Sequence, residues 1–265
     1  ADHPENFPML VSIFNDVIGP VMRGASSSHC AAALRIGRLA RDLIGGTPES
    51  LVLEFDRAGS LPTTHESQGS DMGLFGGLLG WDADDPRLPD SAAALGAAGT
   101  SVRFETVDTG DPHPNTYRLT LTRAGRTHRL HAISTGGGMI EMIMVDGVPL
   151  SVHGDYHETL VCFTGSGAED AARSLADRLP ALAPHAEPDV LAVRQAAAGA
   201  ILQIETHAPL PPPLHAAIVA ACPAAAVHTL APVLPVRSRR TMSVPFSSAT
   251  ELIAVDAGRH EPLWK

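Results

Sequence analysis

Three consecutive serines and a histidine, Ser26, Ser27, Ser28 and His29, stand directly before a stretch with helical spacing. The backbone N–H groups in the first turn of a helix have no partner inside the helix, and the helix dipole places partial positive charge there. The serine hydroxyls add hydrogen-bond donors, and His29 adds a group that titrates near neutral pH. The cluster therefore predicts a binding site for a carboxylate or a phosphate. In the alternative interpretation, Ser27 or Ser28 only caps the helix.

Two other segments also have residue types that suit a binding site. The polar stretch from Gly59 to Asp71 lies between an expected strand and an expected helix, where ligand-binding loops are often found. The run from Gly136 to Gly138 permits backbone conformations closed to other residues, so a ligand or another chain could approach the backbone there. The residue types alone are equally compatible with a solvated loop at the first segment and with a β-bulge at the second.

Composition excludes several classes of protein. The chain has 265 residues, of which 44% are hydrophobic, so it can bury sizeable cores. Its formal net charge of −10 argues against a nucleic-acid surface, and its apolar runs are too short to span a membrane. The first residues lack the pattern of a secretion signal, and the odd number of widely separated cysteines, Cys30, Cys162 and Cys222, suits a reducing cytoplasm. These cysteines form no motif that could hold zinc or an iron–sulfur cluster, so we expect no metal site in this chain.

Periodicity predicts the elements that must position the first two clusters. Residues 31–44 read as a helix that ends at Gly45-Gly46, and residues 72–79 read as a second helix. The glycines of the second helix alternate with apolar residues, which predicts close packing against another helix rather than a phosphate loop. Strands are expected at 51–55, 116–122, 128–133 and 139–145, with a hairpin turn at residues 123–126.

The pattern changes after Gly154. Strands are expected at 158–164, near Val190, at 199–206 and at 226–230, with helices at 167–182 and 213–221. This order is βαββαβ, which is the ferredoxin-like order of small regulatory domains. Residues 237–248 read as a linker, and a short helix is expected to begin near Ser248.

Taken in order, these clusters resemble the β chain of the iron–sulfur-dependent L-serine dehydratases, also called L-serine ammonia-lyases. The resemblance runs from about residue 10 to residue 234. The segments that carry it are Ser12-Ile-Phe and Ile18-Gly-Pro, Ser26-Ser-Ser-His29, Gly59-Ser-Leu61, Gly69-Ser-Asp71, His113-Pro-Asn-Thr116, and Ser134 to Glu141 with its triple glycine. The resemblance implies an α+β fold. A β domain at 1–153, similar to the serine-site domain of some phosphoglycerate dehydrogenases, would precede an ACT-like βαββαβ domain at 154–234 and a connector at 235–265.

The resemblance also implies a reaction and a partner. The reaction is β-elimination from L-serine or a related β-substituted amino acid, which gives a 2-oxo acid and ammonia or a dehydro product. A [4Fe–4S] cluster, held by a separate α chain, acts as a Lewis acid on the substrate. This chain would then be one subunit of a cytoplasmic hetero-oligomeric lyase, active only with the α chain. The alternative is a non-catalytic, amino-acid-binding regulatory subunit.

The resemblance implies the site residues one by one. His29 and His65 are the candidate catalytic residues. The candidate substrate-binding residues are Ser26, Ser27, Ser28, Gln68, Gly69, Ser70, Asp71, Asn115, Gly136, Gly137 and Gly138. Gln68 stands where the family has a histidine, and a glutamine cannot shuttle a proton. His65 stands where the family usually has a small residue, so we expect His65 to replace the missing histidine. The alternatives are that His29 acts alone, or that the substrate and the reaction differ from those of the family. The turn from Thr164 to Gly167 is a weak version of the ACT ligand turn.

Overall fold

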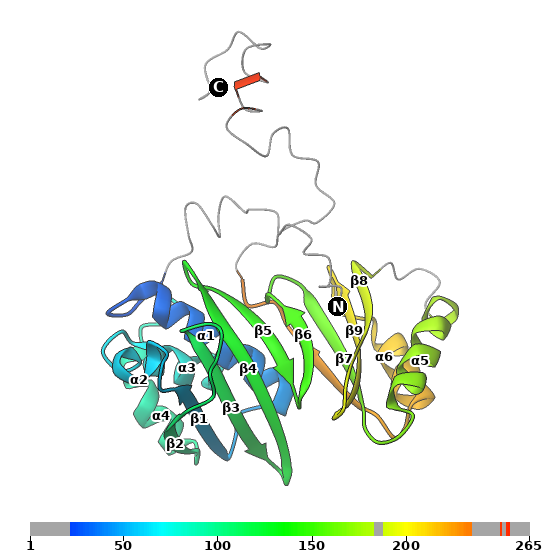
Figure 1. The fold of residues 1–265 in the computed structure, drawn as a ribbon, viewed down its shortest axis with the longest axis horizontal. Helices are drawn as coiled ribbons and strands as arrows, with labels where there is room; N and C mark the ends of the chain where they lie inside the picture. Colours follow the sequence, from blue (N-terminus) through cyan, green and yellow to red (C-terminus); the bar gives the residue numbers. More distant parts are fainter. Residues whose placement is uncertain (1–21, 183–187, 235–249, 251–252, 255–265) are drawn as a thin grey trace. The chain divides into compact units, whose positions relative to one another are not determined.

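The computed structural model describes residues 22–182, 188–234, 250 and 253–254. Residues 12–237 form one compact unit, and every element below belongs to it. The predicted signature segment at 12–20 and the predicted linker at 237–248 lie outside the described residues, and the expected helix near Ser248 is described only in part. The fold is α+β with two sheets, as predicted (Figure 1).

The first sheet has six strands in the order β2-β1-β3-β4-β5-β6 (Figure 1). Their bounds are β1 Ser50–Asp56, β2 Ser101–Val107, β3 Thr116–Arg123, β4 Arg126–Gly136, β5 Met139–Val145 and β6 Val148–Val152. Strand β2 runs parallel to β1, and every other neighbouring pair is antiparallel. The four strands predicted for this sheet are confirmed, and the two that sequence reasoning missed, β2 and β6, are its edges.

Four α-helices accompany this sheet, with bounds α1 Ser27–Ile44, α2 Leu61–Thr64, α3 Ser70–Leu79 and α4 Ser91–Ala97. Helix α1 ends at Gly45, whose φ of 78° is the left-handed conformation expected of a glycine cap. It begins four residues before the predicted start, and its N-cap is Ser26. The interpretation that Ser27 or Ser28 caps the helix is therefore wrong. The predicted loop at 59–71 is also interrupted, because it contains α2 and the first residues of α3.

Helices α1 and α3 pack against one another in the same direction. A Cβ added at Gly73 would lie 2.0 Å from the carbonyl oxygen of Cys30, and one at Gly77 would lie 2.0 Å from that of Leu34. The contact therefore advances along both helices together, which makes them parallel. The predicted close packing by glycines is confirmed, and the partner helix is the one that follows the serine cluster.

The second part of the unit carries a four-stranded sheet in the order β10-β7-β9-β8. Its elements are β7 His157–Phe163, α5 Ala168–Leu182, β8 Val190–Ala196, β9 Gly199–Thr206, α6 Pro212–Ala221 and β10 Ala226–Leu230. The predicted βαββαβ order is confirmed. Helices α5 and α6 cover one face of this sheet, and from the other face Leu160, Ile201 and Leu230 join the core of the first sheet. The assignments to a serine-site domain and an ACT-like domain, and the boundaries at 153 and 234, stay predictions.

Candidate functional site

The starts of helices α1 and α3 lie side by side. The backbone N–H of Ser26 donates to the backbone oxygen of Gln68 over 3.1 Å, which ties the N-cap of α1 to the loop that precedes α3. Because the helices are parallel, the positive ends of their dipoles meet at this point. Neither N-cap residue, Ser26 or Gly69, makes a side-chain capping bond. The arrangement therefore favours an anion at this point.

The available donors come mainly from α1. The N–H groups of Ser27, Ser28 and His29 have no hydrogen-bond partner among the described residues. In α3 the first two N–H groups, from Ser70 and Asp71, already donate to the backbone oxygen of His65, at 2.9 and 3.4 Å. A bound carboxylate would thus be held by the first turn of α1, with α3 contributing its dipole.

His29 belongs to this helix start. Its Nδ1 lies 2.7 Å from Oγ of Ser26, so one of the two donates a hydrogen bond to the other. When the serine donates, Nδ1 is the acceptor and the ring proton is on Nε2. The His29 ring is half-buried and the Ser27 side chain is exposed. Three of the predicted residues, Ser26, Ser27 and His29, are therefore neighbours at one end of α1.

His65 is paired with Asp71. Its Nδ1 lies 2.8 Å from both carboxylate oxygens of Asp71, and its ring packs against Phe104, with the centroids 4.9 Å apart, and against Phe55, with the centroids 5.1 Å apart. Burial raises the pKa of Asp71, and the hydrogen bond from His65 acts in the opposite direction. An Asp–His pair fixes the tautomer and the orientation of the imidazole, which is an arrangement that general acid–base catalysis uses. The prediction that His65 replaces the family histidine stays a prediction.

Three buried polar atoms in and behind the loop before α3 lack a well-formed hydrogen bond to any described residue: Gln68 Oε1, Ser70 Oγ and the hydroxyl of Tyr117. Sequence reasoning named Gln68 and Ser70 but missed Tyr117, which lies on β3. The available signal was its position directly after the segment from His113 to Thr116, together with the need of a buried tyrosine hydroxyl for a partner. Natural proteins leave few such atoms, so this group calls for an explanation.

Asn115 connects the segments on either side of this loop. Its side-chain Oδ1 accepts a hydrogen bond from Ser60 Oγ, and its backbone oxygen accepts from the N–H of Ser134 over 3.1 Å. Its own N–H donates to Nδ1 of His113 over 3.1 Å. Asn115 thus holds the start of α2 and the end of β4 together, which is a positioning role within the structure.

The glycine run forms the end of β4 and the turn to β5. The register shifts between Ser134 and Gly136, as the bulge interpretation expects. Gly138 packs on α1: its oxygen accepts from Nη1 of the buried Arg35, and a Cβ added there would lie 3.0 Å from that nitrogen. A Cβ added at Gly136 or Gly137 would meet nothing within 4 Å, so the backbone there is open to approach.

The described residues do not fit an iron–sulfur cluster. They contain no group of three or more His, Cys, Asp or Glu side chains that could hold a metal ion. Burial raises the pKa of Cys30 to about 11 and that of Cys162 to about 12, whereas a metal ligand must be the thiolate. No step of the chemistry below is therefore assigned to a cluster held by these residues.

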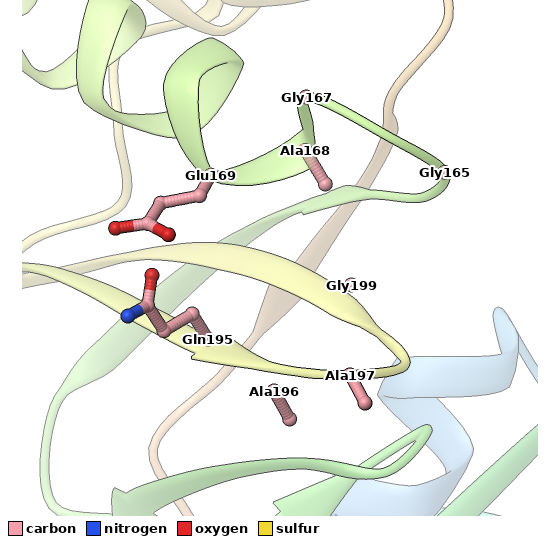
Figure 2. A pocket seen from close by; sticks show the side chains of 8 residues that line it. All are labelled: Gly165, Gly167, Ala168, Glu169, Gln195, Ala196, Ala197 and Gly199. Carbon is pink, nitrogen blue, oxygen red and sulfur yellow. The ribbon is translucent and has the colours of Figure 1, made fainter.

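A separate cavity of about 430 Å³ lies in the second part of the unit. It is lined by the turn from Gly165 to Gly167, the start of α5 and the hairpin between β8 and β9. Figure 2 shows the side chains of Glu169 and Gln195 facing one another at one side of this cavity. The cavity lies at the predicted ACT ligand turn, and none of its lining residues belongs to the candidate substrate site.

Comparison with known proteins assigns the family. The chain is 40% identical over 150 residues to the probable L-serine dehydratase beta chain of Bacillus subtilis (strain 168), which covers 57% of this chain and 67% of that protein. The chain belongs to the L-serine dehydratase beta-chain family. It is also 32% identical over 148 residues to the L-serine dehydratase beta chain of Peptoniphilus asaccharolyticus, over 55% of this chain and 66% of that one. The resemblance stated from the motifs is therefore confirmed.

The matched region spans about two thirds of the length of each L-serine dehydratase beta chain. No family model matches the sequence. Within the described ranges, no helix has both the length and the hydropathy needed to cross a bilayer.

Proposed function

We propose that this chain is the β subunit of an L-serine dehydratase, and that it binds the carboxylate of L-serine or of a related β-substituted amino acid at the starts of α1 and α3. The observation that carries the proposal is the parallel pairing of these helices, which brings two positive dipole ends to the serine cluster. Membership in the family supports the proposed reaction class, which is β-elimination to a 2-oxo acid and ammonia. The chain's own structure supports the binding half of this proposal.

In this proposal the first turn of α1 binds the substrate carboxylate. The N–H groups of Ser27 and Ser28, together with the nearby hydroxyls, donate to the carboxylate oxygens. Hydrogen bonds of this kind, to a charged group, contribute about 1.5–3 kcal/mol each. Two or three of them provide enough free energy to orient an amino acid with its Cα towards a base.

Two histidines are available for proton transfer. His29 lies in the first turn that would hold the carboxylate, with Nδ1 against Ser26. His65 is oriented by Asp71, in the loop where the family has its own histidine. We propose His65 as the proton-transferring residue, because its pairing with the Asp71 carboxylate fixes the tautomer and the orientation of the imidazole. His29 acting alone is the alternative.

The [4Fe–4S] cluster belongs, in this proposal, to a separate α chain. The names of the two relatives describe beta chains, which is why we propose an α chain as the partner. Cys30 and Cys162 are buried with raised thiol pKa values, and they are unsuited to supply cluster ligands from this side.

The proposal is tested by anaerobic reconstitution. The chain alone is expected to be colourless and inactive. Mixed with the α chain of an L-serine dehydratase, it is expected to form a complex that converts L-serine to pyruvate and ammonia. A stoichiometric iron–sulfur absorption on this chain alone would contradict the two-chain assignment.

The same experiment separates the regulatory alternative. If the α chain converts L-serine equally well without this chain, and this chain only shifts the substrate dependence, the chain is a regulator. Loss of all turnover in its absence supports the catalytic role.

A further inference from the structure

Tyr117 lies behind the start of α3. Its side chain is 1% exposed, and its ring packs edge-on against Phe55 with the centroids 5.8 Å apart. Burial raises the pKa of its hydroxyl to about 12, and the neighbouring Ser70 hydroxyl acts in the opposite direction. The tyrosine therefore stays protonated at physiological pH, with a proton to donate.

The hydroxyls of Tyr117 and Ser70 do not form a well-formed hydrogen bond with one another. Both are buried, and neither makes a well-formed hydrogen bond to any described residue. Leaving a buried hydroxyl unpaired is unfavourable, and buried polar atoms in natural proteins are nearly always paired. A small movement of the start of α3 towards β3 would close the bond between Tyr117 and Ser70.

A bound ligand could cause that movement. Ser26 at the start of α1 is hydrogen-bonded through its N–H to Gln68, two residues before Ser70. An anion bound at the start of α1 therefore acts on the same loop that carries Ser70. A ligand shifts an equilibrium only as far as it binds one state more tightly, so the anion must bind more tightly to the state in which the start of α3 has moved and the bond between Tyr117 and Ser70 is closed.

We propose that Tyr117 is a positioning residue of the substrate site: its hydroxyl donates to Ser70 Oγ when an amino-acid carboxylate is bound, and so fixes the start of α3. The inference rests on the proposed function, because it takes L-serine as the ligand. Tyr117 does not touch the substrate. It acts through Ser70 and the loop from Gln68 to Asp71.

The test uses the fact that the chain has two tyrosines, Tyr117 and Tyr156. With tyrosine labelled by ¹³C at Cζ in this chain alone, and the chain then mixed with unlabelled α chain, the complex gives two resonances, assigned by Tyr117→Phe and Tyr156→Phe. Titration with L-serine is expected to move the Tyr117 resonance, with a midpoint equal to the substrate affinity. The Tyr156 resonance stays in place, and in Ser70→Ala the Tyr117 resonance no longer responds.

Kinetics give a second readout. Tyr117→Phe keeps the ring and removes the hydroxyl, so it is expected to raise KM about two- to tenfold, the scale of one hydrogen bond, with kcat nearly unchanged. Tyr156→Phe is the matched control, because Tyr156 is also 1% exposed but lies in the second part of the unit. It is expected to leave KM unchanged.

The failures of the two proposals are distinguishable. If L-serine binds to the complex and the Tyr117 resonance does not move, the positioning role is wrong and the proposed function stands. If L-serine does not bind to the complex at all, the proposed function is wrong and the inference falls with it. Because the shift is measured in the unmodified chain, a folding defect in a variant does not decide the result.

Discussion

Replacing Gly77 by alanine tests whether the parallel contact of α1 and α3 determines the stability of this part of the fold. The new methyl group would lie 2.0 Å from the backbone oxygen of Leu34 and 2.9 Å from the backbone nitrogen of Arg38. Backbone atoms cannot rotate away, so the two helices must separate by roughly 1.2–1.5 Å, since carbon and oxygen normally pack at about 3.5 Å or a few tenths less. Overpacking of this kind costs about 1–3 kcal/mol.

For Gly77→Ala to destabilise the chain, the cost of overpacking must exceed the gain in helix propensity that alanine brings. Alanine is the better helix former by about 1 kcal/mol, so an alanine without a clash would stabilise the chain. Two other glycines calibrate the result. A Cβ at Gly76 meets the movable methyl group of Leu88 at 2.3 Å, and one at Gly96 in α4 meets nothing within 4 Å. We therefore expect Gly77→Ala to destabilise most, Gly76→Ala less, and Gly96→Ala to be neutral or mildly stabilising.

Urea unfolding of the chain, followed by the fluorescence of its two tryptophans, measures these differences. The overpacking cost of about 1–3 kcal/mol less the helix-propensity gain of about 1 kcal/mol leaves a net loss of up to about 2 kcal/mol, which corresponds to a fall in Tm of up to roughly 8 °C for a chain of this size. If Gly77→Ala is as stable as Gly96→Ala, the close contact of the two helices is wrong, and with it the meeting of their dipoles at the serine cluster.

Three other predictions follow from the site and from a buried histidine. The double change Ser27→Ala with Ser28→Ala is expected to weaken L-serine binding to the complex about tenfold, the equivalent of about 1.4 kcal/mol. An unchanged affinity would show that the two serine hydroxyls do not bind the substrate. His65→Ala is expected to slow single turnover at least about a hundredfold, the lower scale of acid–base catalysis, and parental activity in this variant would exclude His65 as the base. Burial, and then the nearby His128, lower the pKa of His228 below its ordinary 6.5, so the unfolded chain takes up this proton first and stability is lost as pH falls below about 6.5. In His228→Gln the fall in unfolding free energy between pH 7 and pH 5.5 is expected to shrink, and an identical pH dependence would contradict the assignment.

Some elements could be predicted because their patterns are set by burial. The glycines at 73 and 77 alternate with apolar residues, and this spacing indicated a close helix contact before the partner was known. The strands of the second sheet follow the expected order because each carries buried residues between turn signals. The edge strands of the first sheet were harder to predict from the sequence. Strand β2 is exposed along most of its length, and β6 contains Pro149, which weakens a strand signal and is tolerated at an edge.

The site was predictable as a set of segments but not as a geometry. The clusters at 26–29 and 68–71 were named from residue types and from the family motifs, whereas their contact depends on the direction in which α1 and α3 pack. That direction depends on which face of each helix carries the small residues. It is fixed only when both helices have packed on the sheet. The pairing of His65 with Asp71 follows from a short helix, α2, which its four residues did not indicate in the sequence. Tyr117 was missed because its hydroxyl reaches the loop from a distant strand.

The parallel starts of α1 and α3 have a consequence for how ligands reach the site. The field of a helix end falls off within about one turn, whereas the net charge of −10 acts at longer range and repels negatively charged molecules. A molecule with a carboxylate and an ammonium group has no net charge at neutral pH, so it approaches without this repulsion and is then attracted by the helix ends at contact. A dicarboxylate meets the repulsion first, and added salt screens it. If the proposed substrate site is right, the fold would favour zwitterions over acids during the encounter itself, before any side chain contacts the substrate.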